Sequence, residues 1–256
     1  MNLQNQFDLS NRVAFITGAS KGIGLAIARG LCQFGAHVVI SSRRAAAVAE
    51  VAAGLRAEGL QVSSVGCHMG KPDEIAAAID TIGEEHGRLD ILINNAATNP
   101  VYGPIQDADE AAFDKIMQVN VKGPFMLCKA AYPLLKASPG ASVINISSIE
   151  AIKPDQGLGL YSVSKAALVT MTQVMAKEWG AAGIRVNTIC PGLVKTKFSA
   201  ALWQNEQMMA HINTQLPLGR IAQPEEMVGL ALFLASDASS YCTGGMYLAD
   251  GGYVIA

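Results

Sequence analysis

The most constraining feature of the sequence is a regular alternation of short apolar runs with longer segments of helical spacing. The first run, 12–17, is β-branched and aromatic, and the segment 22–34 behind it has apolar residues one helical turn apart before Gly35. Further strands are predicted at 37–41, 60–66, 89–93, 142–147 and 184–189, and further helices at about 45–58, 72–86, 108–135 and 161–181. Such alternation predicts an α/β fold, with a parallel sheet covered by helices on both faces.

The length of the chain fits one domain. We expect residues 1–256 to form a single α/β unit, because 256 residues bury a large core and no linker-like or repeated segment interrupts the pattern. Ligands of doubly wound sheets bind at the carboxyl ends of the strands. Four chemically informative residues directly follow predicted strands: Gly18, Asn94, Ser148 and Pro191.

Charge and hydrophobicity exclude several classes of protein. Charged residues make up 16% of the chain, and the net charge of −2 offers no basic field for nucleic acid or anionic lipid. No apolar run approaches the ~18 residues of a membrane span, and the polar start of the chain is unlike a signal peptide. We therefore expect neither nucleic-acid nor membrane partners.

The cysteines indicate a reducing compartment and no metal site. The five thiols are odd in number and scattered, with no Cys-x-x-Cys spacing, which is typical of reduced residues in a cytoplasmic protein. Cys67 and His68 form the only adjacent pair of soft ligands, and no second cluster completes a zinc site.

The turn after the first predicted strand has the composition of a phosphate cradle. Its glycines have the spacing G-x-x-x-G-x-G, and the helix that follows supplies N–H donors and the positive end of its dipole. The alternative is a glycine-rich turn without a phosphate, but the place of this turn in the first βα unit favours a dinucleotide. The residues expected to contact it are Gly18, Ser20, Lys21, Gly22, Ile23 and Gly24.

The end of the second strand predicts NADP in preference to NAD. An NAD site usually has Asp or Glu there to bind the ribose 2′-hydroxyl, whereas this chain has Ser42, Arg43 and Arg44. Guanidinium groups and a serine hydroxyl suit a 2′-phosphate, and Lys21 adds a second cation. The alternative is that Arg43 and Arg44 lie in solvent at a helix start, where their charge would oppose the dipole.

Tyr161 and Lys165 form the candidate proton-transfer pair. On a helix they lie one turn apart on the same face. A free tyrosine has a pKa of about 10, and a nearby ammonium is expected to lower that pKa toward the range in which proton transfer to or from an alcohol is effective. By itself the spacing is also that of ordinary neighbours on a helix surface.

Taken together, the motifs resemble the short-chain dehydrogenase/reductase family over essentially the full length. The resemblance implies a Rossmann-type sheet of about seven parallel strands, the last near 246–248. It rests on the ordered set Thr17-Gly18-Ala19-Ser20-Lys21-Gly22-Ile23-Gly24, Asn94-Asn95-Ala96-Ala97, Asn120, Ser147-Ser148, Tyr161-x-x-x-Lys165 and Pro191-Gly192.

The resemblance also implies catalytic roles. Tyr161 would donate or accept the proton at the substrate oxygen, and Lys165 would lower its pKa and bind the nicotinamide ribose. Ser148, chosen over Ser147 because it precedes Tyr161 by the family's usual separation, would hydrogen-bond the same oxygen. Asn120 would hold a water that links Lys165 to solvent.

Further cofactor contacts follow from the same resemblance. Asn95 and Ala96 would line the cofactor cleft, and the nicotinamide end would lie against Pro191, Gly192, Val194 and Thr196. At the adenine the family often has Asp followed by an aliphatic residue. This chain has His68 and Met69 there, which puts the usual carboxylate contact in doubt.

The segment 197–218 is expected to form a lid over the substrate. Its apolar residues suit a mainly apolar carbonyl compound, or they serve only to pack the lid down: Phe198, Leu202, Trp203, Met208 and Met209. At the position of Glu150 the family often has a small residue. Glu150 is expected either to contact a polar substrate group or to face solvent. Local sequences around 67–71, 94–100 and 192–196 resemble the branch of NADPH-dependent carbonyl and retinal reductases.

Two helices indicate a homo-oligomer. The segments 108–135 and 161–181 are apolar on more than one face, which a helix facing a single core is not. The resemblance implies a homotetramer formed through these helices and the last strand.

The sequence therefore predicts an NADP-dependent oxidoreductase that interconverts a ketone or aldehyde and an alcohol. A 3-oxoacyl-[acyl-carrier-protein] reductase shares every motif, but no concentrated basic docking patch is evident. A non-catalytic NADP-binding regulator is disfavoured because Tyr161 and Lys165 are both present.

Overall fold

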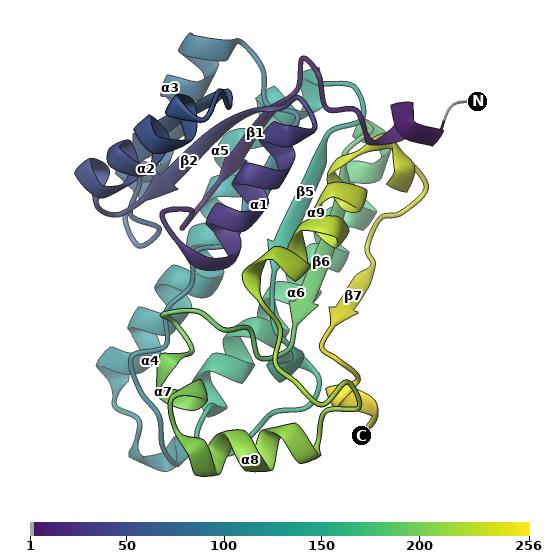
Figure 1. The fold of residues 1–256 in the computed structure, drawn as a ribbon. Coiled ribbons are helices and arrows are strands. Elements are labelled where there is room, and N and C mark those ends of the chain that lie inside the picture. Colours follow the sequence, from purple (N-terminus) through teal and green to yellow (C-terminus); the bar gives the residue numbers. More distant parts are fainter. Residues whose placement is uncertain (1–2) are drawn as a thin grey trace.

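The protein forms a seven-stranded, all-parallel sheet, as the sequence predicts (Figure 1). We describe residues 3–256 from a computed structural model. The strand order is β3-β2-β1-β4-β5-β6-β7. The strands are β1 Val13–Ile16, β2 His37–Ser42, β3 Val62–Gly66, β4 Ile91–Asn94, β5 Ser142–Ile146, β6 Arg185–Pro191 and β7 Met246–Ala249. The predicted strands are confirmed, with ends that shift by one or two residues.

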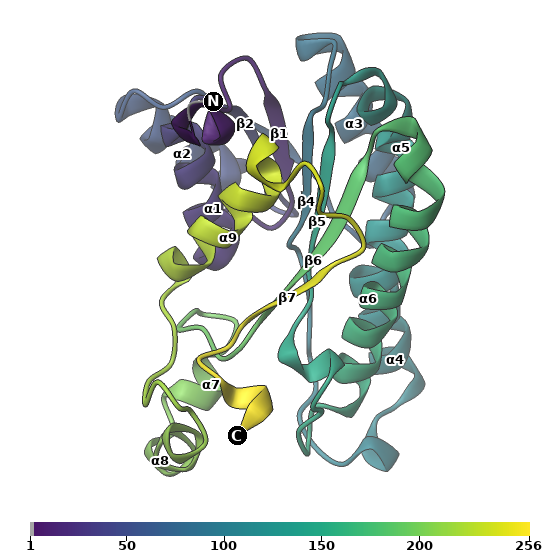
Figure 2. The same cartoon turned by 90° about the vertical axis from the view of Figure 1, so that its right-hand side faces the viewer.

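Helices cover both faces of the sheet (Figure 2). One face carries α1 Gly22–Gln33, α2 Ala45–Ala57 and α9 Val228–Ala235, and the other carries α3 Pro72–His86, α4 Glu110–Met117, α5 Gly123–Ala137 and α6 Gly159–Trp179. Because successive side chains of a strand point to opposite faces, Ile16 packs with Ile27 and Leu232 in one core, while Phe15 packs with Leu127 in the other.

The strand order reverses between β1 and β4, which places the switch point at the centre of the sheet. The strands all end at the same edge, above the segment that contains α7 Ala200–Trp203 and α8 Glu206–Thr214 (Figure 1). Within residues 3–256, no helix combines the length and the apolarity that a membrane crossing needs.

The long helix predicted at 108–135 is not continuous. A π-turn, Gln118–Lys122, separates α4 from α5, and the Gly123 N–H bonds to the carbonyl of Gln118, five residues back. Pro124 explains the break, because it has no N–H to donate to the preceding turn. The backbone at Gly123 also lies against the β3–α3 connection, where an added Cβ would meet the Met69 carbonyl oxygen at 2.3 Å.

Candidate active site

Four predicted catalytic residues come from three elements that meet at the carboxyl edge of the sheet. Ser148 follows β5, Tyr161 and Lys165 lie on the first turns of α6, and Asn120 lies in the π-turn. Lys165 and Asn120 are almost fully buried, with exposed fractions of 2% and 1%. The Lys165 Nζ is 5.5 Å from the centroid of the Tyr161 ring.

The Ser148 side chain lies near enough to the Tyr161 hydroxyl to lower the pKa of Tyr161 as a hydrogen-bond partner. Ser148 caps the short 3-10 helix Ile149–Ala151, and its Oγ accepts from the Glu150 N–H at 3.2 Å. The Phe198 ring of the predicted lid lies 6.0 Å from the Tyr161 ring, centroid to centroid. The predicted lid therefore reaches the neighbourhood of Tyr161.

The pKa of Tyr161 is raised, not lowered as the sequence-based argument expected. Burial is the main cause, and it outweighs the lowering effect of the hydrogen bond to Ser148, while the charge of Glu150 adds to the rise. Lys165 does not offset this, because its Nζ donates to the Ile146 carbonyl at 2.8 Å and burial lowers its own pKa to about 8. Burial thus favours the neutral form of both side chains.

Asn120 ties the π-turn to its surroundings. Its Oδ1 accepts from the Thr98 N–H at 2.8 Å, and its Nδ2 donates to the Thr98 carbonyl at 2.9 Å and to Ser164 Oγ at 3.1 Å. The amide therefore joins the loop after β4 to α6. The water relay through Asn120 stays a prediction.

A chain of buried polar side chains anchors α6 to the sheet, and of its members only Asn94 stood out in the sequence. Asn94 donates to Asn145 Oδ1 at 2.8 Å, Asn145 donates to Thr172 Oγ1 at 2.8 Å, and Thr188 donates to the same Thr172 oxygen at 2.7 Å. Ser147, which ranked below Ser148 as the catalytic serine, donates to the Lys165 carbonyl at 2.9 Å. The sequence offered one signal for this chain of side chains: polar residues lie inside strands that are otherwise apolar, as in β5, and buried polar groups need hydrogen-bond partners.

The glycine turn packs tightly against the loop after β4. Gly18 has a φ of 65°, and an added Cβ there would lie 2.8 Å from the Ala96 Cα. Thr17 Oγ1 accepts from the N–H groups of Asn95 and Ala96, and Asn95 Nδ2 donates to the Thr17 carbonyl. At Gly24 an added Cβ would come within 2.5 Å of Asn95 Nδ2. Side chains at these glycines would therefore push the turn away from the loop after β4.

The loop after β6 lies over the same turn. Gly22 has a φ of 59°, and its nearest neighbour is Thr196, whose Cγ2 would be 3.3 Å from an added Cβ. Pro191 ends β6 and Val194 pairs with Ala222, while Gly192 faces the Asp250 backbone. The predicted phosphate and nicotinamide contacts are therefore brought together.

The residues expected around the 2′-phosphate lie at the carboxyl end of β2. Ser42 ends the strand and its Oγ bonds to the backbone of Arg44, which is the N-cap residue of α2. Lys21, Arg43 and Arg44 are exposed, and across residues 3–256 none of the three has a carboxylate partner. These cations are positioned to bind an anion.

His68 and Met69 follow β3, where the adenine is expected. His68 donates its backbone N–H to Glu74 at 2.9 Å, and its Nδ1 accepts from the Gly70 N–H at 2.9 Å. Met69 is buried, with an exposed fraction of 4%. The His68 ring is thus held by its own turn.

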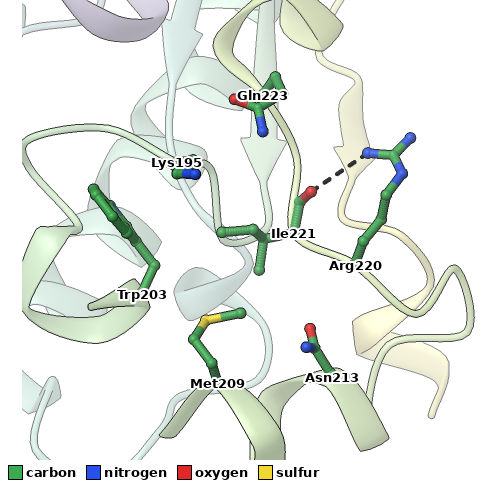
Figure 3. A pocket seen from close by; sticks show the side chains of 7 residues that line it. All are labelled: Lys195, Trp203, Met209, Asn213, Arg220, Ile221 and Gln223. Atoms are coloured by element: carbon green, nitrogen blue, oxygen red, sulfur yellow. Dashed lines mark hydrogen bonds between the residues drawn. The ribbon is translucent and has the colours of Figure 1, made fainter. Parts of the chain in front are cut away.

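The predicted lid also borders a cavity of about 540 Å³ that does not include Tyr161 in its lining (Figure 3). Trp203 donates its Nε1–H to the Thr196 carbonyl at 2.8 Å, which fixes α7 to the loop after β6. For Trp203, packing of the lid is therefore a demonstrated role. The cavity is lined by Lys195, Trp203, Met209, Asn213, Arg220, Ile221 and Gln223.

In the described part of the chain, no three His, Cys, Asp or Glu side chains gather into a metal-binding group. Cys67 is buried, and burial raises its pKa to about 11, so that this thiol stays protonated near neutral pH.

Comparison with known proteins finds a family model and relatives that match nearly the whole chain. A family model described as enoyl-(acyl carrier protein) reductase matches residues 18–254. Dehydrogenase/reductase SDR family member 4 of Oryctolagus cuniculus is 45% identical over 244 residues, which cover 95% of this chain and 94% of the relative.

Two solved structures have the same fold. A gluconate 5-dehydrogenase from Burkholderia cenocepacia, in complex with NADP and tartrate, has a TM-score of 0.96 with 31% identity and covers 100% of each chain. The Pseudomonas aeruginosa RhlG/NADP complex has a TM-score of 0.92 with 35% identity and covers 99% of this chain and 100% of that one.

The buried Lys165 generates a test of stability against pH. Because its folded-state pKa of about 8 lies below the ordinary lysine value, the unfolded chain binds more protons between that pH and about 10.4, so wild-type stability should rise across this window. We expect Lys165→Met to raise the free energy of unfolding at pH 7 by about 1–3 kcal/mol, the lost bond to Ile146 offsetting part of the gain. Chemical denaturation at pH 7 and pH 10 measures this difference.

The advantage of Lys165→Met should shrink as the pH approaches 10. Lys177→Met, an exposed change on the same helix, serves as the control and should show no such trend. A wild type that is as stable as the Lys165 variant at pH 7 would contradict the burial argument.

Proposed function

The chain belongs to the short-chain dehydrogenase/reductase family, and from this premise we propose that it is an NADP-dependent enzyme interconverting a ketone or aldehyde and the corresponding alcohol. Members of this family act as oxidoreductases on alcohol and carbonyl groups. The observation that carries the proposal is the grouping at one site of Ser148, Tyr161 and the buried Lys165, whose Nζ lies 5.5 Å from the centroid of the Tyr161 ring.

The residues present fit a nicotinamide dinucleotide. The turn at Gly18 leaves no room for a Cβ, and unpaired cations stand at the end of β2. When bound, NADPH would supply the hydride for reduction and NADP+ would accept it in oxidation. The backbone of the glycine turn would hold the pyrophosphate, and the loop 191–196 would hold the nicotinamide end.

The side chains of the site would transfer the proton that accompanies the hydride. Tyr161 Oη would give a proton to the substrate oxygen during reduction and take one during oxidation, while Ser148 Oγ would hold that oxygen and stabilise developing charge. Because the pKa of Lys165 is about 8, both its charged and its neutral form are accessible near neutral pH. This suits a role for Lys165 in passing the proton toward Asn120.

The substrate is proposed to be mainly apolar. Phe198 supports this assignment, since its aromatic ring lies 6.0 Å from the Tyr161 ring, centroid to centroid. The solved relatives include a gluconate 5-dehydrogenase, so a panel of substrates must contain polyhydroxy acids as well as apolar ketones, aldehydes and a 3-oxoacyl thioester.

We predict that Tyr161→Phe abolishes turnover of this panel with NADPH. Loss of the proton donor should lower kcat by about 10²–10⁴-fold and leave NADPH binding intact, as measured by cofactor fluorescence. Tyr132→Phe, whose ring packs on Trp179 away from the site, is the matched control.

Each outcome of this screen separates the candidates. Turnover of the thioester alone would favour the 3-oxoacyl reductase. NADPH binding by the wild type without turnover of any substrate would favour a regulator, and a Tyr161→Phe enzyme within tenfold of wild type would refute the proposed proton donor.

The cofactor preference has its own test in Arg43→Asp. If Arg43 binds the 2′-phosphate, losing this charge-assisted contact should reduce kcat/KM for NADPH by about 10–150-fold and leave that for NADH equal or higher. Lys136→Asp, an equal change of charge at an exposed position of α5, should alter neither value. A wild type that prefers NADH, or an unchanged ratio in the variant, would contradict NADP preference.

We also propose a homotetramer. The outer sides of α4, α5 and α6 expose Phe113, Phe125, Val163 and Val174, and the edge strand β7 exposes Leu248 (Figure 2). Between these helices lies a cavity of about 760 Å³, with Phe125 in its lining.

Light scattering at micromolar concentration is expected to give four times the chain mass of 26.8 kDa. Phe125→Glu should lower the measured mass, because it would bury a charge in the contact. A wild-type monomer would contradict the proposal.

The cytoplasmic location stays a prediction.

A further inference from the structure

Glu150 is a buried carboxylate at the edge of the candidate active site. From the sequence, Glu150 was expected either to contact a polar substrate group or to face solvent. The second expectation is wrong, because only 6% of the residue is accessible to solvent. Burying a carboxylate is costly unless its oxygens are hydrogen-bonded. The partners of Glu150 therefore indicate what the residue does.

The hydrogen bonds of Glu150 reach the Ser148 hydroxyl and the residue that follows Tyr161. Its backbone N–H donates to Ser148 Oγ at 3.2 Å. Its Oε2 accepts from the Oγ of Ser162, the residue after Tyr161, at 2.7 Å, and from the Asp155 N–H at 3.0 Å. One residue thus links the end of β5 to the first turn of α6.

The loop that carries this link is fixed from its other side by the C-terminal turn, Tyr253–Ile255. Tyr253 Oη donates to both carboxylate oxygens of Asp155, at 3.0 and 2.9 Å. Lys153 Nζ donates to the carbonyls of Tyr253 and Ala256 at 3.1 and 2.8 Å. The loop 151–158 therefore has little freedom to move Glu150.

The charge of Glu150 also acts on the site. Asp155 from the loop, Tyr161 from α6 and Tyr253 from the C-terminal turn face Glu150, while Lys165 from α6 and Cys190 from β6 face Tyr161. Burial raises the pKa of Glu150, and the bonds from Asp155 and Ser162 oppose that rise. When ionised, Glu150 raises the pKa of Tyr161.

We propose that Glu150 is a positioning residue for proton transfer, which holds the Ser148 hydroxyl with its backbone and the Tyr161 turn with its carboxylate. The inference rests on the proposed function, since it concerns the same two hydroxyls. Their relative placement decides whether both reach one substrate oxygen, and a misplacement of about 1 Å can cost about 10²-fold in rate.

The test compares three variants in NADPH-dependent turnover of the best substrate. Glu150→Ala removes the carboxylate bonds to the first turn of α6, leaves the backbone bond to Ser148, and should lower kcat by about 10–100-fold with NADPH affinity unchanged. Glu150→Gln keeps an oxygen that can replace Oε2 and accept both bonds, so kcat should stay within about fivefold of wild type. Ser162→Ala leaves the carboxylate and should lower kcat in the same direction as Glu150→Ala, which keeps the test open if that variant does not fold.

The pH profile distinguishes positioning beside Tyr161 from general support of the fold. Without the negative charge, Glu150→Gln should move the Tyr161-dependent limb of the kcat profile to lower pH by about 0.5 unit or more. Reduction, which needs the phenol, would then fail at lower pH, and oxidation, which needs the phenolate, would begin at lower pH. Glu178→Gln, an exposed change at the far end of α6, is the control.

Two results would overturn the inference. One is kcat within twofold of wild type in both Glu150→Ala and Ser162→Ala. The other is an equal loss in the Ala and Gln variants with the pH limb unmoved, which a merely structural role produces. A wild type without turnover, or an active Tyr161→Phe enzyme, would refute the proposed function itself and so is distinguishable from both.

Discussion

The geometry of the site depends on hydrogen bonds buried between α6 and the central strands. Asn145 contributes the middle link, because it accepts from Asn94 on β4 and donates to Thr172 on α6. These groups have given up water, so their hydrogen bonds inside the protein favour the observed placement of the helix on the sheet. Tyr161 and Lys165 lie on the same helix. The placement of α6 on the sheet therefore also determines where these two residues lie.

Burial then sets the electrostatics of the site. The pKa of Tyr161 is raised and that of Lys165 is lowered to about 8 by the same cause, loss of water around a charge. The contribution of Lys165 is therefore not a simple attraction for the phenolate, since its Nζ is already bound to the Ile146 carbonyl. Glu150 adds a negative charge on the other side of Tyr161.

The π-turn shows how a local irregularity serves the site. Pro124 interrupts the helical ladder, and the extra residue per turn leaves Asn120 with its amide bonded to Thr98 and Ser164. Irregular turns of this kind are frequent at functional sites. Pro124 was visible in the sequence, and the apolar periodicity on both sides of it concealed the break.

The sequence by itself determined the sheet, the order of its elements and the strand ends where the chemistry lies, because apolar periodicity and glycine turns are local properties of the chain. It also predicted Ser148, Tyr161 and Lys165 as candidate catalytic residues, and their roles stay a prediction. Only the tertiary structure decided the direction of the Tyr161 pKa, the links made by Glu150 and the anchoring of α6 through Asn145. These depend on how much water each group loses and on partners up to 51 residues away, as between Asn94 and Asn145, and no local pattern records either quantity.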